Sequence, residues 1–300
     1  MRPAPIALPA AAGADARPKP PPRPSYEALR VFARNPSALA GVLLLAAILA
    51  VTIFGPMVMQ ADPFEIAAAP MEPPGGELLL GSDYLGRDVL TGMVYGGRAT
   101  LLVGVVAAVL SMAIGITIGA LAGYYGGWVD ETLMRITEFF QVLPTLLFAM
   151  VLVTLFSPSL ATIAIAIGVV SWTGTARLAR GEFLRLKRRE YVLAKRVIGA
   201  GDARIIWRVI LPNALAPLIV SATLAIGTAI LFEAGLSFLG LGDPNVMSWG
   251  LMIGSNRPYI LTAWWAVTLP GAAIFLTVLA VSLIGDGLND ALNPTSRGRA

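Results

Sequence analysis

The 300-residue chain contains few side chains that can do chemistry at neutral pH. It has no cysteine and no histidine, which excludes disulfides, thiolate nucleophiles, imidazole bases and the usual zinc or haem ligands. None of Lys19, Lys187 and Lys195 follows a glycine, so the sequence contains no P-loop for nucleotide phosphates. The remaining carboxylates, hydroxyls and lysines form no cluster at helical spacing. We therefore expect no catalytic residue, bound cofactor or metal ion in this chain.

One ionisable residue, Glu233, lies inside a long hydrophobic run. A carboxylate at such a position in a membrane is a functional candidate, because an unpaired charge there is costly. Glu233 lies close to the predicted outer end of its run. A hydrogen-bonding or packing role therefore competes with a place on a solute path, for which the sequence names no other residue.

The segment 190–212 is basic, amphipathic and enclosed by hydrophobic runs. Wound as one helix, its first part and the residues before it place six side chains on one face, interrupted by Lys187 and Glu190: Phe183, Leu186, Tyr191, Ala194, Val197 and Ile198. Gly199-Ala200-Gly201 is predicted to break this helix, and Asp202 to cap a second short helix that ends at Ile210. Such a pair would project from the membrane towards a partner. A helix lying on anionic headgroups is the alternative.

Composition places these candidates in a polytopic membrane protein, since 56% of residues are hydrophobic, 13% are charged and the mean hydropathy is +0.74. Hydrophobic runs long enough to cross a bilayer predict an all-α chain with six transmembrane helices. These are Ala38–Met59, Ala99–Gly123, Phe139–Phe156, Leu160–Ala176, Ala214–Gly240 and Ala263–Gly285. The fourth run fades after Val170 into Ser171–Thr175, so we expect it to face protein or a water-filled path rather than lipid.

The positions of the cations predict the topology. Of the 22 Lys and Arg residues, only Arg87, Arg98 and Arg257 fall in segments assigned to the outside, which predicts that both termini are cytoplasmic. The net charge of +4 therefore reflects this bias and does not indicate binding to nucleic acid. Residues 1–25 are expected to be a disordered cytoplasmic tail without a signal peptide. They precede the first helix and outer loop (26–98), a core (99–290) and a second tail (291–300).

Three shorter patterns can also be interpreted, and two of them allow an alternative. Asp83, Arg87 and Asp88 fit an ion pair or helix cap, or else a contact with substrate. Tyr124–Trp128 is predicted to be a tight inner turn whose aromatic residues anchor at headgroup depth. A stripe of small residues in the second span, Gly115, Gly119 and Gly123, fits packing within the chain or against a second chain.

The spacing of Ala194, Gly199 and Leu211-Pro212 resembles the "EAA" loop of permease subunits of ATP-binding-cassette (ABC) importers. This chain has Leu193-Ala194-Lys195 where the family has Glu-Ala-Ala, and Val209 where isoleucine is usual. Further stretches resemble the peptide/nickel branch, second-permease type. These are Gly81–Asp88, Glu233–Gly242 and Gly285–Leu292, and the resemblance extends from about Ala28 to Pro294.

The resemblance implies a type I ABC importer permease fold in a bacterial inner membrane. It implies a second permease subunit, two ATP-binding subunits that hold the ATP, and an extracytoplasmic solute-binding protein. The residues implied to couple this chain to the ATPase are Glu190, Ala194, Gly199, Asp202, Arg204, Arg208, Leu211 and Pro212. Short peptides are the expected solute, and nickel complexes, glutathione-like compounds and oligosaccharides remain open. A secondary transporter or channel without an ATPase is the alternative class, although neither inverted repeats nor ionisable relays stand out.

Overall fold

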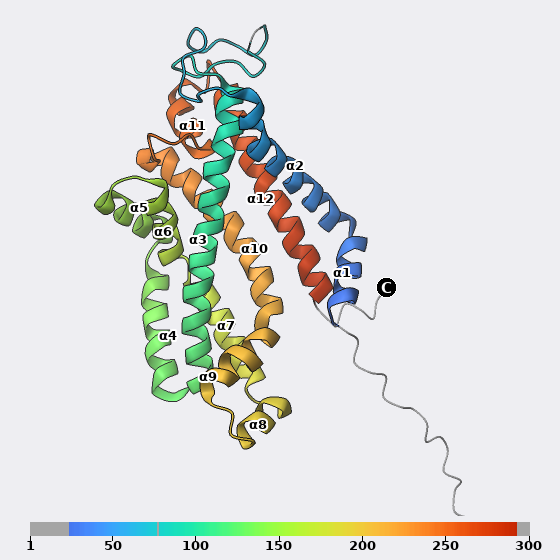
Figure 1. Ribbon diagram of the computed structural model, residues 1–300. Helices are drawn as coiled ribbons and strands as arrows, with labels where there is room; N and C mark the ends of the chain where they lie inside the picture. Colours follow the sequence, from blue (N-terminus) through green and yellow to red (C-terminus); the bar gives the residue numbers. More distant parts are fainter. Residues whose placement is uncertain (1–23, 77, 293–300) are drawn as a thin grey trace, which may run out of the picture.

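The structure, a computed structural model, describes residues 24–76 and 78–292, and its regular elements are helices (Figure 1). The predicted all-α class is confirmed for this part of the chain, in which loops and isolated β-bridges connect the helices and no strand is formed. The α-helices are α1 (Pro24–Arg34), α2 (Pro36–Met59), α3 (Val89–Tyr125), α4 (Gly127–Val142), α5 (Thr145–Phe156), α6 (Leu160–Val170), α7 (Thr173–Leu186), α8 (Glu190–Val197), α9 (Asp202–Ile205), α10 (Leu211–Leu236), α11 (Trp249–Asn256) and α12 (Trp265–Leu292). Two π-helical segments, η1 (Ile206–Ile210) and η2 (Ser237–Leu241), and a 3₁₀ turn, η3 (Arg257–Tyr259), complete them.

Six membrane spans fit the described helices. Four helical runs are long and apolar enough to span alone: α2, α3, the run Asp202–Leu241 that contains α10, and α12. The bent pairs α4–α5 and α6–α7 bring the number to six. The predicted tails at 1–25 and 291–300 lie largely outside the described residues, although Pro24 and Ser25 begin α1 and α12 extends to Leu292.

The predicted third span, Phe139–Phe156, is wrong as a straight helix. The chain bends by 86° between α4 and α5. Pro144 causes the break, since the ring disfavours helical backbone at the preceding residue, and Leu143 is extended with φ −70° and ψ 129°. The helix before the bend also begins earlier than predicted, at Gly127.

The predicted fourth span, Leu160–Ala176, also needs correction. Helix α6 ends at Val170, and after Ser171 and Trp172 the chain bends by 44° into α7, which continues to Leu186. The break falls on the polar run where the sequence pattern fades. It places a helix end in the middle of the bundle, where backbone groups need protein or water as partners.

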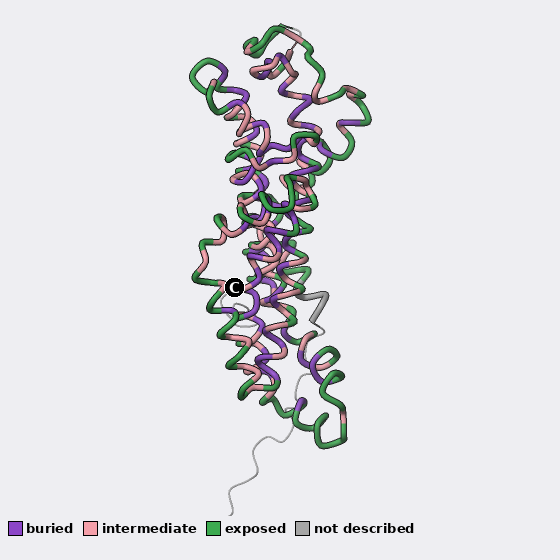
Figure 2. Tube along the Cα trace, turned by 90° about the vertical axis from the view of Figure 1, so that its left-hand side faces the viewer, coloured by how far each residue is buried: buried purple, intermediate pink, exposed green. Residues whose placement is uncertain are grey.

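Helix α3 lies at the centre of the bundle and packs closely along α7 (Figure 1). A methyl group on Gly119 would lie 2.2 Å from the carbonyl oxygen of Ala176, and one on Gly123 would lie 2.7 Å from Cβ of Phe183. The glycine stripe is therefore explained by packing within this chain, the first of its two interpretations. Buried residues follow the axis of the bundle, while both ends of the molecule carry exposed stretches (Figure 2).

An arginine supplies a hydrogen-bond donor that α2 lacks. Pro56 has no N–H to donate to the carbonyl of Thr52 four residues earlier. Nε of Arg98, on α3, donates to that oxygen at 2.8 Å, and a second guanidinium nitrogen donates to the carbonyl of Ile53. Arg98 thus replaces the missing donor and joins α3 to α2.

The loop between α2 and α3 lies with α11 at one end of the bundle, and α8 and α9 lie at the other (Figure 1); we call these the α11 end and the α8 end. Asp88 caps α3 by accepting hydrogen bonds from the backbone N–H groups of Leu90 and Thr91, which is one of the interpretations that the sequence left open. Asp83 accepts from two backbone N–H groups of its own turn. Arg87 lies over the ring of Phe64 at 4.9 Å from its centroid, and these contacts give all three residues structural roles.

Candidate functional site

The segment 190–212 forms a compact projection at the α8 end (Figure 1). Helix α8 is followed by a turn through Gly199, and then by α9, which continues through η1 into α10. The predicted glycine corner is present, but the second helix does not end at Ile210. Leu211 and Pro212 lie inside a helical run that extends from Asp202 to Leu241 with a kink at Gly240. Leu211 is half-buried and Pro212 is exposed.

The single apolar face predicted for Phe183 to Ile198 is wrong. The helix breaks between Leu186 and Glu190, so Phe183 and Leu186 are buried on α7, whereas Val197 and Ile198 are 87% and 72% exposed on and after α8. The break changes the rotation of the second part relative to the first. The buried residue of α8 is instead Val192, which is fully enclosed.

Gly199 terminates α8. Its φ of +81° is a left-handed conformation that glycine adopts at little cost. Its N–H donates to the carbonyl of Arg196, and the next N–H, of Ala200, donates to that of Lys195, both at 3.0 Å. This is the Schellman pattern, which satisfies two carbonyls at the helix end. No other part of the described chain lies within 4 Å of a methyl group placed on Gly199, so its surface is open there.

Asp202 joins the projection to α3 and is not the helix cap that the sequence predicts. Gly201 occupies the cap position without a side-chain hydrogen bond. The hydroxyl of Tyr124 instead donates to Oδ1 of Asp202 at 2.6 Å, and Arg196 donates to the same hydroxyl at 3.2 Å. The hydrogen bond to Tyr124 also raises the pKa of Arg196. Aromatic-belt anchoring, the sequence interpretation for this turn, therefore misses Tyr124, which is 5% exposed.

Two further polar contacts fix the elements around the projection. Nζ of Lys187 donates to the carbonyl of Gly123 at 2.7 Å, near the end of α3. Burial lowers the pKa of Lys187, and the neighbouring charge of Arg188 lowers it further. Arg180, on α7, forms a bidentate pair with Asp130, on α4, at 2.5 and 2.7 Å. The ends of α3, α4 and α7 are thus joined beneath the projection.

An apolar cluster lies between the projection and the bundle. Val192, Ile205 and Ile206 are buried there and belong to a core cluster that includes Ala120 and Phe183. The projection is therefore packed against α3 and α7 as well as hydrogen-bonded to them. We expect it to move together with these helices, since a packed core transmits displacement.

The outward surface of the projection combines cations with apolar side chains. Arg204 and Arg208 are exposed and lie four residues apart in α9 and η1, which brings them to one side of that helical run. Glu190 and Ala194 are exposed on α8. The exposed apolar side chains of the projection are Tyr191, Leu193, Val197, Ile198 and Trp207. Such a surface is typical of a protein contact.

Glu233 lies at the other end of the molecule, fully buried where α10 meets α11. Its Oε1 accepts hydrogen bonds from the hydroxyls of Ser237, at 2.9 Å, and Ser248, at 2.8 Å. Ser248 in turn caps α11. These contacts join α10 to α11, and they correspond to the hydrogen-bonding role that the sequence leaves open for this residue.

Comparison with known proteins identifies the family of this chain. A family profile described as "Binding-protein-dependent transport system inner membrane component" matches residues 115–298, and another described as "N-terminal TM domain of oligopeptide transport permease C" matches residues 24–74. The chain is 42% identical to the "Di/tripeptide transport system permease protein DppC" of Pseudomonas aeruginosa, over 93% of this chain and 95% of that protein. It is 37% identical to the "Oligopeptide transport system permease protein OppC" of Bacillus subtilis, over 90% of each.

The chain therefore belongs to the permease family of binding-protein-dependent ABC importers. Within it, the chain falls in the branch of the dipeptide and oligopeptide permeases, in the second-permease group. Among solved structures, an inward-facing form of the MetNI methionine ABC transporter matches with a TM-score of 0.57 and 20% identity, covering 67% of this chain and 96% of that chain. This likeness shows the fold, a type I importer permease. The family match does not support the secondary-transporter alternative.

Proposed function

We propose that this chain is the membrane subunit through which a bacterial importer moves di- or oligopeptides across the inner membrane. The 42% identity to a di/tripeptide permease along almost the whole chain carries this proposal. In it, the chain pairs with a second permease subunit and receives solute from an extracytoplasmic binding protein. Two ATP-binding subunits hydrolyse the ATP, and the first helix with its loop (26–98) precedes the permease core (99–290).

Coupling to the ATPase is assigned to the segment 190–212. Its open surface carries Arg204 and Arg208 beside apolar residues, and cations of this kind pair with carboxylates on a partner. Its inner side is held by Tyr124 and by the apolar cluster. Movement of the ATPase subunits therefore displaces α3 and α10 through a packed contact.

The α8 end faces the cytoplasm in this proposal, and both termini lie there. The projection and the residues before it carry many of the cations, which favours the cytoplasmic side. The described ends of the chain lie side by side, since α1 packs against α12 and the amide of Asn35 donates to Asp290 at 3.2 Å. A shared side for the two termini is what an even number of spans requires.

The first experiment tags the carboxy terminus, purifies the chain gently from its native membrane and identifies the proteins that accompany it by mass spectrometry. Recovery of an ATPase and a second permease, followed by ATP-dependent peptide uptake in reconstituted vesicles, is the expected result. Isolation of the intact chain without any ATPase, even after cross-linking, would overturn the proposal.

Substitutions on the open surface test the coupling contact. We expect Val197→Asp together with Ile198→Asp to reduce recovery of the ATPase at least about tenfold, because the two side chains are the most exposed apolar groups of the projection. The matched control, Ile198→Val, retains an apolar surface and should leave recovery unchanged. Full assembly and coupled uptake with the aspartate pair would move the contact elsewhere on the chain.

A further inference from the structure

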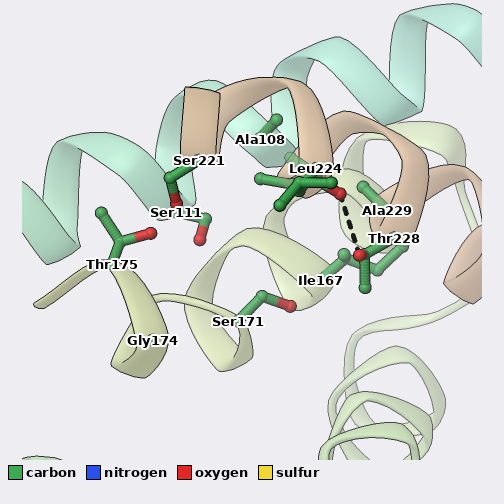
Figure 3. A pocket seen from close by; sticks show the side chains of 12 residues that line it. Ala108, Ser111, Ile167, Ser171, Gly174, Thr175, Ser221, Leu224, Thr228 and Ala229 are labelled. Atoms are coloured by element: carbon green, nitrogen blue, oxygen red, sulfur yellow. Dashed lines mark hydrogen bonds between the residues drawn. The ribbon is translucent and has the colours of Figure 1, made fainter. Parts of the chain in front are cut away.

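A small, partly open cavity lies between α3, α10 and the junction of α6 with α7 (Figure 3). Its volume is about 180 Å³, which is room for several water molecules or a small polar group. Five hydroxyl-bearing residues line it: Ser111, Ser171, Thr175, Ser221 and Thr228. In Figure 3 these side chains come from different helices and surround one space.

Two of these hydroxyls have no hydrogen-bond partner in the described chain. They are Oγ of Ser111 and Oγ of Ser171, and both atoms are buried; Ser111 as a whole is 2% exposed. By contrast, Thr228 donates to the carbonyl of Leu224 at 2.9 Å, and Thr175 is 3.5 Å from the sulfur of Met112, a weak acceptor. Buried hydroxyls without partners are unfavourable, so this cavity is suited to a guest that forms hydrogen bonds.

None of the described residues that line the cavity is ionisable. Between the hydroxyls it is formed by small or apolar residues such as Ala107, Ala108 and Gly174. The lining offers no opposite charge to an ammonium or a carboxylate, so the charged ends of a peptide must lie beyond it, whereas a neutral main-chain amide fits. A hydroxyl can both donate and accept, so it pairs with the N–H or the C=O of an amide. Contacts of this kind do not depend on which side chain the guest carries.

The break between α6 and α7 adds a second feature. The first turn of α7, which includes Gly174 and Thr175, lines the cavity, and this helix start has no side-chain cap. A helix N-terminus carries partial positive charge and favours a carbonyl oxygen nearby. Ser171, Gly174 and Thr175 of the polar run thus border this partly open cavity.

We propose that this cavity is part of the solute path through this chain, and that its hydroxyls contact the main-chain amides of the transported peptide. This inference rests on the proposed function and adds the chemical group recognised inside the membrane. Weak, uncharged contacts allow a solute to enter and leave, as conduction requires. Selection by side chain is then left to other parts of the assembly.

Thiol labelling tests whether solute reaches the cavity. Because the chain has no cysteine, Ser111→Cys introduces its only thiol. In the complex assembled with its partner subunits, a small water-soluble thiol reagent should modify this position, and trialanine delivered by the binding protein should slow the modification at least about fivefold. Ala149→Cys is the control, since Ala149 is 1% exposed in a core cluster and does not line the cavity. Absence of labelling, or labelling that trialanine does not slow, overturns the proposal.

Removal of the hydroxyls tests the contact itself. Ser111→Ala with Ser171→Ala should reduce uptake of trialanine at least about fivefold, and should abolish most of the difference in uptake between trialanine and its N-methylated form. Thr117→Val is the control, since this exposed hydroxyl on α3 is bonded to the carbonyl of Ala113. Recovery of the partner subunits must stay at the wild-type level.

The outcomes separate the two proposals. If the wild-type complex imports no peptide, the proposed function fails. If the wild type imports trialanine and the double alanine variant does so equally, with the same sensitivity to N-methylation, the transport function stands and the inference about the cavity is wrong.

Discussion

The hydroxyl of Tyr124 is expected to hold the 190–212 projection against α3, and Tyr124→Phe removes only this hydroxyl. The hydroxyl donates to the carboxylate of Asp202 at 2.6 Å and accepts from Arg196. A hydrogen bond to a charged group contributes about 1.5–3 kcal/mol. Asp202 is exposed, so we take the lower limit, and a loss of about 1.4 kcal/mol corresponds to a tenfold change in an equilibrium constant.

Hydrogen exchange measures this change locally. In Tyr124→Phe the backbone amides from Ile205 to Ile210 should exchange about tenfold faster, because α9 separates from α3 more often, while amides in the middle of α3 remain as protected as in the wild type. Tyr125→Phe is the matched control, since Tyr125 is 51% exposed and adjacent in sequence. An importer assembled with the Tyr124→Phe variant should transport less peptide for each ATP that its ATPase subunits hydrolyse. Equal exchange in the two variants would refute the assigned role of this hydroxyl.

Three other predictions concern backbone and packing. Gly199→Ala should destabilise the projection by about 1 kcal/mol because φ is +81°, whereas Gly201→Ala, at φ −67°, should be close to neutral. The hydrogen-exchange rates of the α8 amides measure both effects, and equal rates in the two variants would contradict the argument. Arg98→Met should lower the unfolding temperature, and this fall should be smaller in a chain where Pro56→Ala restores the missing N–H donor. If the effects of the two substitutions on the unfolding temperature simply add, Arg98 does not compensate for Pro56. Gly119→Ala should reduce the yield of folded chain severely, since its methyl group would lie 2.2 Å from an α7 carbonyl oxygen, and a normal yield would show that α3 and α7 can separate without cost.

Hydrophobicity predicts the membrane spans well, because an apolar run of sufficient length has few other stable locations. The bends inside two of them depend on local backbone features. Pro144 follows Leu143 directly and was a usable signal for the first bend. The bend at Ser171 and Trp172 has no such residue, and the polar character of the run indicated only that the helix weakens there.

The candidate site shows a different limit of sequence reasoning. Gly199 and the corner that it forms follow from local backbone preference, and the sequence predicts them. The hydrogen-bond partner of Asp202 cannot be predicted from local preference, because Tyr124 lies 78 residues away and contacts Asp202 only when α3 and α9 are packed together. The hydroxyls of Ser111 and Ser171 share one cavity for the same reason. Tertiary contacts of this kind leave no periodic pattern in the chain.

The helical run from Asp202 to Leu241, which leaves helical geometry only at Gly240 near its end, acts geometrically as a lever. Its 40 residues, at a rise of 1.5 Å each, span about 60 Å. A tilt of about 5° around one end therefore displaces the other by about 5 Å, which is more than the diameter of a water molecule. The π-helical segments near its two ends, η1 and η2, are places where extra backbone length can be absorbed. Small angular changes at the projection are thus sufficient, without unfolding any helix, to change the spacing around Glu233 at the opposite end.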